Sequence, residues 1–199
     1  HYAYDKGYLI SLISNRNNDD FVEQIISRQC DGIIVSSLSI PEAYIRRFTD
    51  VGIPVVVLQN RDYQDLSGAA IIQTGLYGGA RDGVNYLAEQ GRKHIHVITG
   101  CIDPAQTAHA VAEYCRSHPV DAILGRSDKV ACIAMQAVMD IGLRVPQDIA
   151  VVGFDNSSLS QYMRPTMTSI EIQRDPIGKA AVDMLDQMLN GGEVPAPQE

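Results

Sequence analysis

The sequence predicts an α/β protein built on an open, doubly wound parallel sheet, or on two such sheets. Short apolar runs recur along the chain, and each is followed by a turn and a stretch with helical spacing. The runs do not alternate with polar residues, which is typical of strands covered by helices on both faces. Strands that alternate with helices form right-handed βαβ units and therefore parallel sheets. With 199 residues, 45% of them hydrophobic, the chain can form one core or two small ones.

The expected elements follow one another in a regular order. The expected strands are 8–14, 31–37, 53–60, 69–74, 93–100, 120–127 and 148–156. The expected helices are 19–29, 40–52, 78–91, 108–118, 128–142 and 174–192. The glycine-rich segment 75–80 has neither the phosphate-loop lysine nor the spacing of a dinucleotide turn, so it predicts the start of a helix.

The expected helix 128–142 has a single apolar face, because its apolar residues recur at i, i+3, i+4 and i+7. Ser127 or Asp128 can cap its start, and Gly142 can close it. In the expected helix 174–192, Asp175 fits the N-cap position and Pro176 the first turn. Core packing explains both apolar faces without a cofactor.

The charge of the chain limits its partners. The formal net charge is −8 and the sequence pI is near 5.0, so the surface repels phosphate backbones and the chain alone is a poor nucleic-acid binder. No apolar run approaches the roughly 18 residues of a membrane span, and the N-terminus has no secretion signal. The sequence therefore predicts no membrane contact, and it predicts a cytoplasmic protein unless a secretion signal has been removed.

The sequence predicts neither an enzyme nor a metal or cofactor site. It has no GxSxG, GxGxxG, GxxxxGK[ST] or HExxH motif. His94 and His96 share one face of an expected strand, but no third ligand is evident. Four cysteines have no metal-like spacing and are expected to be buried or half-buried thiols in a reducing compartment. They are Cys30, Cys101, Cys115 and Cys132.

Polar side chains gather where the expected strands end, and ligands of doubly wound sheets bind at that edge. These groups include Ser37, the pair Gln59 and Arg61, the run Arg126–Asp128, and Asp155 with Asn156. Most are hydrogen-bonding groups without acid–base pairing, which suits a polar ligand such as a sugar. Asp155 could bind such a ligand through two hydroxyl hydrogen bonds, or it could simply cap the following helix.

Three stretches resemble the effector-binding core of lactose-repressor-type (LacI/GalR) transcription regulators. They are "PVVVLQNR", "GGARDGVNYLAEQGRKHIHVITG" and "GLRVPQDIAVVGFDNSSLSQYMRPTMTSIEIQRDPIGKAAVDML". The last is the most specific, and the resemblance covers nearly the whole chain. It implies two α/β lobes of periplasmic-binding-protein-like type, 1–72 with 173–199 and 73–172, with the effector in a cleft between them.

The resemblance also implies which residues bind the effector. The ligand carboxylate of the family falls on Asp155, and a cleft polar residue falls on Gln59. The usual asparagine of an "ND" pair is replaced by Ser127, while Asp128 is kept. Arg174 stands where an aromatic or apolar residue is common, which favours a charged effector such as a sugar phosphate or sugar acid.

The resemblance implies partners that this sequence does not itself contain. DNA would be bound by an N-terminal helix-turn-helix headpiece, and a homodimer would use surfaces at 129–139 and 159–163. Three parts of the family pattern are missing: the headpiece with the first strand, about thirty residues near Cys101–Thr107, and the C-terminal strand. A periplasmic solute-binding protein for sugars is the alternative function.

Overall fold

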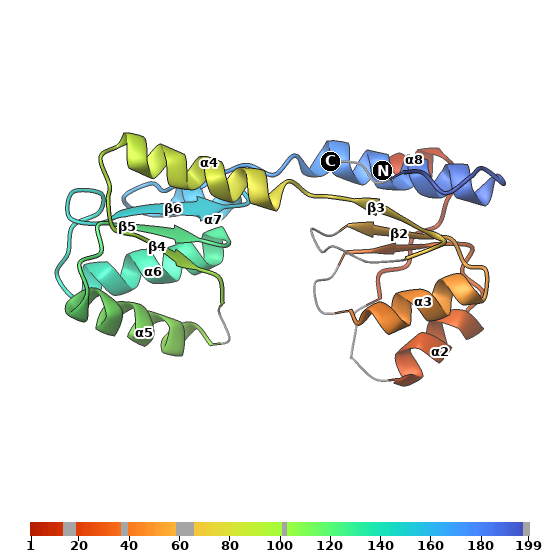
Figure 1. Ribbon diagram of the computed structural model, residues 1–199, viewed down its shortest axis with the longest axis horizontal. Coiled ribbons are helices and arrows are strands. Elements are labelled where there is room, and N and C mark those ends of the chain that lie inside the picture. The colour runs from red at the N-terminus through yellow and green to blue at the C-terminus, as the bar shows by residue number, and fades with distance from the viewer. Residues whose placement is uncertain (14–18, 37–39, 59–65, 101–102, 197–199) are drawn as a thin grey trace. The chain divides into compact units, whose positions relative to one another are not determined.

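The computed structural model of the protein describes residues 1–13, 19–36, 40–58, 66–100 and 103–196 (Figure 1). The chain divides into two compact units. Unit 1 consists of His1–Leu76 and Gln173–Glu199, and unit 2 consists of Tyr77–Ile172. Unit 2 is therefore a continuous segment, whereas unit 1 is assembled from both ends of the chain.

Unit 1 is a three-stranded parallel sheet with helices on both faces (Figure 1). Its strands, in spatial order, are β1 (Ile33–Val35), β2 (Val55–Leu58) and β3 (Ala69–Ile72). Helices α2 (Asp19–Ser27) and α3 (Glu42–Asp50) cover one face, and α8 (Arg174–Leu189) covers the other. In β2, Val55 and Val57 pack with the α3 core while Val56 packs with α8, so all three valines are buried. This two-sided burial explains the unbroken apolar run.

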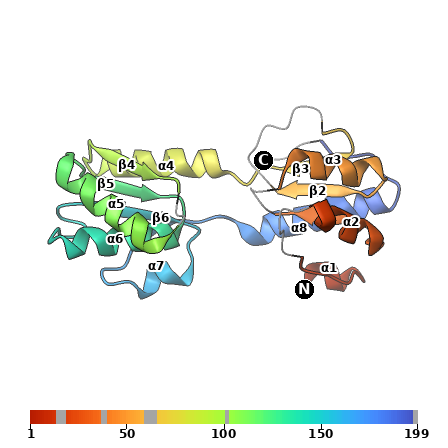
Figure 2. The same ribbon diagram turned by 90° about the horizontal axis from the view of Figure 1, so that it is seen from below.

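Unit 2 repeats the design with four parallel strands. Their order is β4 (Ile95–Ile98), β5 (Ala122–Gly125), β6 (Ala150–Phe154) and β7 (Thr168–Ile170). Helix α4 (Leu76–Glu89) covers one face, α5 (Pro104–Ser117) and α6 (Asp128–Asp140) cover the other, and the short α7 (Ser158–Tyr162) links β6 to β7 (Figure 2). The predicted fold class, α/β with doubly wound parallel sheets, is confirmed.

The predicted strand at 8–14 is wrong over its described part. Tyr8–Ile13 lies outside both sheets, and the side chains of Leu9 and Leu12 are 90% and 97% exposed. The backbone N–H of Tyr8 instead donates to the carbonyl of Ala3, at 3.0 Å, and its hydroxyl donates to Asp186. Tyr8 is thus held by α1 and α8 rather than by a neighbouring strand, and an apolar run without a strand partner forms no ladder.

The helix ends agree only in part with the predictions. Ser127 is the N-cap of α6 and accepts a hydrogen bond from the backbone N–H of Val130 at 3.3 Å, as one of the two predicted options had it. Gly142 has φ +87° just after α6, as a closing glycine should. The predicted N-cap Asp175 is wrong, because α8 begins at Arg174 and its N-cap is Gln173, two residues before Asp175.

The predicted helix start in the glycine-rich segment 75–80 is confirmed by α4, and its glycines allow close packing. A Cβ atom on Gly79 would lie 2.6 Å from the Phe154 ring, and one on Gly83 would lie 2.6 Å from Cδ1 of Ile170. Side chains at these two positions would push α4 away from β6 and β7. The glycines therefore set how closely the helix covers the sheet.

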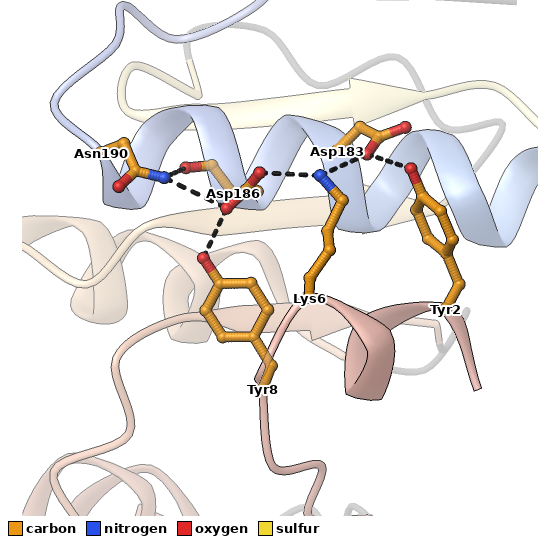
Figure 3. Close-up of polar contacts among 6 residues, drawn as sticks. All are labelled: Tyr2, Lys6, Tyr8, Asp183, Asp186 and Asn190. Carbon is orange, nitrogen blue, oxygen red and sulfur yellow. Dashed lines mark hydrogen bonds and ion pairs between the residues drawn. The ribbon is translucent and has the colours of Figure 1, made fainter.

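The N-terminal segment packs on the last helix of unit 1, where α1 (Tyr2–Asp5) and the residues after it bind α8 (Figure 3). The ammonium group of Lys6 lies 3.0 Å from Asp183 and 2.8 Å from Asp186. The hydroxyls of Tyr2 and Tyr8 donate to the same carboxylates, at 2.7 Å and 2.6 Å respectively. These contacts lower the pKa of both aspartates: hydrogen bonding from Tyr2 is the largest cause for Asp183, and from Lys6 for Asp186.

Candidate functional site

The predicted site residues fall into three groups. Ser37, Gln59 and Arg61 lie outside the described residues. Ser127, Asp128 and Asp155 lie in unit 2, where the carboxyl ends of β5 and β6 share one edge of a parallel sheet. Arg174 is the first residue of α8 in unit 1 and is exposed. The structure thus brings three of the seven together.

The turn between β6 and α7 has an unusual backbone. Asp155 has φ +101° and Asn156 has φ +45°, in the left-handed region that side chains other than glycine seldom adopt. Such residues cost about 1–3 kcal/mol each and persist where their surroundings fix them. They therefore mark the end of β6 as a place where the chain is held in a demanding shape.

Three consecutive backbone N–H groups hold this turn. The N–H of Asp155 donates to the carbonyl of Ile170 at 2.8 Å, and that of Asn156 donates to the Ser169 hydroxyl at 3.0 Å. The N–H of Ser157 donates to the Asp128 carboxylate at 2.5 Å. The carboxyl end of β6 is therefore fastened both to β7 and to the start of α6.

Asp128 is the centre of this arrangement, and only 1% of the residue is exposed. Besides the N–H of Ser157, its carboxylate accepts hydrogen bonds from the Ser157 hydroxyl, at 2.7 Å, and from the Ser169 hydroxyl. A buried carboxylate is stable only when its oxygens find donors, and these three supply them. Its position in the first turn of α6 adds the favourable field of a helix N-terminus.

Gly153 in β6 makes room for the carboxylate. A Cβ atom at this position would lie 2.3 Å from Oδ1 of Asp128 and 2.9 Å from the terminal carbon of Met167. Any larger residue would therefore displace the buried group. The need for this space explains why a glycine interrupts the apolar side chains of β6.

Ser127 and Asp155 lie next to the buried cluster and are themselves half-buried. The N-cap of α7 is Ser157 rather than Asp155, so the Asp155 residue does not occupy the capping position that was its alternative role. Beside them, Arg126 is exposed and donates to the carbonyl of Thr99 at 3.1 Å. The edge thus carries hydroxyl, carboxylate and guanidinium groups suited to polar ligands.

Sequence reasoning missed Ser157, Ser169 and Gly153. The "MTSI" motif gave a signal for Ser169, but no pattern indicated that its hydroxyl reaches Asp128. Within the described part of the chain, no group of three His, Cys, Asp or Glu side chains could hold a metal ion. His96 instead stacks on Tyr114, with ring centroids 4.3 Å apart. No helix among the described residues is long and apolar enough to cross a membrane.

Comparison with known proteins identifies the family to which the chain belongs. The family model of the periplasmic binding protein-like domain matches residues 84–199. The HTH-type transcriptional repressor PurR of Escherichia coli is 26% identical, over 97% of this chain and 68% of the repressor. That alignment runs over 237 positions, more than the 199 residues of the chain, so the repressor holds residues where this chain has none.

Solved structures share the fold. The transcriptional regulator CelR in complex with cellobiose has a TM-score of 0.87 at 21% identity, covering 98% of this chain and 71% of that chain. A LacI family regulator from Arthrobacter sp. FB24 in complex with lactose has a TM-score of 0.79 at 20% identity, covering 99% and 86%. The predicted resemblance is thereby confirmed. The chain belongs to the periplasmic binding protein-like domain family, and it corresponds to the effector-binding core of LacI-type transcription regulators.

Proposed function

We propose that this chain is the sensor of a DNA-binding transcription regulator and that it binds a small polar effector through Asp155 and Ser127. The observation that carries the proposal is the left-handed turn at the end of β6, with Asp155 at φ +101°. Strain of this kind gathers at ligand-binding positions, where a side chain must be presented in one orientation. The carboxyl end of a strand in a doubly wound sheet is also where ligands bind.

The proposed effector is a sugar or a sugar derivative. One ionised carboxylate accepts hydrogen bonds from two neighbouring hydroxyls, and the Ser127 hydroxyl both donates and accepts. The similar regulators solved with cellobiose and lactose support this ligand class. Arg174 and, from the sequence, Gln59, Arg61 and Ser37 are proposed as further contacts. An arginine among them favours a sugar acid or a sugar phosphate, because guanidinium groups bind such anions in a bidentate manner.

The proposed output is a change in DNA binding by a headpiece joined to this core. An effector changes such an output only if it binds one conformation of the regulator better than another. The chain is proposed to act as a homodimer in the cytoplasm and not as an enzyme. Leu159 and Tyr162 of α7 support a dimer surface there, since they are 43% and 78% exposed. The repressor among its relatives favours this function over that of a periplasmic solute-binding protein.

A thermal-shift panel tests the effector site. Cellobiose, lactose, monosaccharides, sugar phosphates and sugar acids are added to the chain, to Asp155→Ala and to Asp140→Ala. Asp140 is a matched control: it is an exposed carboxylate at the other end of α6, about 18 Å from Asp128 at 1.5 Å per residue.

A ligand at a hundred times its dissociation constant adds about 2.7 kcal/mol. For a domain of this size the midpoint then rises by roughly 5–10 °C. We expect such a shift in the parent chain and in Asp140→Ala, and its loss in Asp155→Ala. A shift that survives in Asp155→Ala contradicts the proposed site. Binding of neutral sugars alone contradicts the part assigned to Arg174.

A further inference from the structure

We propose that Asp128 is a positioning residue: it does not touch the effector but holds the Asp155–Ser157 turn in the shape that presents the Asp155 carboxylate. This inference rests on the proposed function, because it explains how the proposed contact is oriented. It also changes the role of Asp128, which the sequence alone places among the ligand contacts.

Both carboxylate oxygens of Asp128 are occupied by the protein itself. Oδ2 accepts from the backbone N–H of Ser157, at 2.5 Å, and from the Ser157 hydroxyl, at 2.7 Å. Oδ1 accepts from the Ser169 hydroxyl and lies 2.3 Å from the position that a Cβ atom on Gly153 would take. With only 1% of the residue exposed, the carboxylate has little surface left to offer a ligand.

These hydrogen bonds reach two of the three residues of the turn, and the third is held by the neighbouring strand β7. Ser157 is bound directly, and Asn156 is bound through a relay, since its N–H donates to the Ser169 hydroxyl that in turn donates to Asp128. The N–H of Asp155 donates to the carbonyl of Ile170, the residue after Ser169 in β7. One buried carboxylate therefore fixes the turn from α6 on one side and from β7 on the other.

The partners of Asp128 explain why an ionised carboxylate is needed there. Two hydroxyls and one backbone N–H all point their hydrogens at it, so the group must only accept. An asparagine of the same size would turn an NH₂ group toward one of these donors. At least one hydrogen bond of the relay would then be lost. The left-handed turn would lose an interaction that compensates for its backbone strain.

Amide hydrogen exchange of the full 199-residue chain, without any ligand, measures the positioning itself. The readout is the protection of the Asp155, Asn156 and Ser157 amides relative to amides in β5. The variants are Asp128→Asn, Ser169→Ala, Ser169→Thr, which keeps a hydroxyl, and Val138→Ala. Val138 is a stability control on the same helix, because it is fully buried in the α5–α6 core and has no part in the relay.

We expect Asp128→Asn to lower the protection of the Asn156 and Ser157 amides by about tenfold or more, a factor that corresponds to loss of one good hydrogen bond. Ser169→Ala should lower the protection of the Asn156 amide in the same way, whereas Ser169→Thr should preserve it. Val138→Ala should leave the protection of the turn amides unchanged. The proposal is overturned if the turn stays protected in Asp128→Asn, or if Val138→Ala exposes it equally.

Binding of cellobiose and lactose by titration calorimetry completes the test. When either sugar binds the parent chain, its affinity should fall about tenfold or more in Asp128→Asn, and Asp128→Asn should add nothing further in an Asp155→Ala background. Binding that is unaffected by Asp128→Asn overturns the positioning role. If binding survives in Asp155→Ala, the proposed contact fails, yet the exchange measurement, which uses no sugar, still decides whether Asp128 shapes the turn.

Discussion

Asp128 in unit 2 and the pair Asp183 and Asp186 in unit 1 each accept several hydrogen bonds, but they differ in their exposure to solvent. In unit 2, Asp128 is buried and its donors are two hydroxyls and a backbone N–H. In unit 1, the Asp183 and Asp186 side chains are 49% and 28% exposed and share the charged Lys6. Water can replace the donors of the exposed pair but not those of the buried one. Similar hydrogen-bond counts therefore imply very different energies.

The largest expected effect is that of Asp128→Ala. This change leaves the hydroxyls of Ser157 and Ser169 and one backbone N–H without an acceptor inside the protein. Since hydrogen bonds to charged groups contribute about 1.5–3 kcal/mol, we expect the free energy of unfolding to fall by about 3 kcal/mol. Urea unfolding measures it. A loss below about 1 kcal/mol would show that water enters and replaces the carboxylate. The buried and the exposed aspartates would then not differ in the expected way.

Gly153→Ala should have the next largest effect. The added Cβ would lie 2.3 Å from the carboxylate of Asp128, so the buried group or the strand must move. Overpacking of this kind costs about 1–3 kcal/mol. Gly78→Ala in α4 is the matched control, because nothing lies within 4 Å of its added Cβ and alanine favours helix. We expect urea unfolding to show destabilisation by the first substitution and none by the second.

Acid should release α1 from α8. The pKa of Asp183 and of Asp186 lies below the ordinary value of 3.8 in the folded chain, chiefly through the Tyr2 hydroxyl and Lys6 respectively. A lowered pKa contributes stability that is present above 3.8 and is lost as the pH falls through the folded-state values. The protection of the Asp5 and Lys6 amides, measured relative to their intrinsic exchange rates at each pH, should therefore fall below about pH 3.8. A fall in protection already between pH 7 and 5 contradicts this assignment.

Lys6→Met should have the smallest effect on unfolding. It removes the charge shared by Asp183 and Asp186, but both tyrosine hydroxyls keep their hydrogen bonds to the same carboxylates. Exposed ion pairs contribute little and are screened by salt. We expect the midpoint of urea unfolding to be almost unchanged, and any difference from the parent chain to shrink at 1 M salt. A loss comparable to that of Asp128→Ala would remove the distinction between the two settings.

The fold was largely predictable because burial on both faces leaves a direct trace in the sequence. The run at 148–156 predicted β6, and Gly142 follows the helix that it was expected to close. The segment 8–14 has an equally apolar composition, yet Tyr8–Ile13 forms no strand. Composition reports what a segment could bury, whereas a strand also needs a neighbour with free backbone groups.

The sequence indicated some residues of the candidate site but none of the contacts between them. Polar residues after a strand point to the binding edge of the sheet, which identified Asp128 and Asp155. The burial of Asp128 depends on Ser169, forty-one residues further along the chain, and on the missing side chain of Gly153. Such contacts arise from strand order and register, which one sequence does not display.

The continuous path of the chain through unit 2 has a consequence for engineering. Its first and last elements meet, because a Cβ atom on Gly79 would lie 3.2 Å from Cγ2 of Ile170. A segment whose ends are neighbours can be transplanted with little disturbance to its host. We therefore expect that residues 77–172 can be exchanged as one segment among chains of this architecture. The transferred segment would carry Asp128, Ser157, Ser169 and Asp155 together.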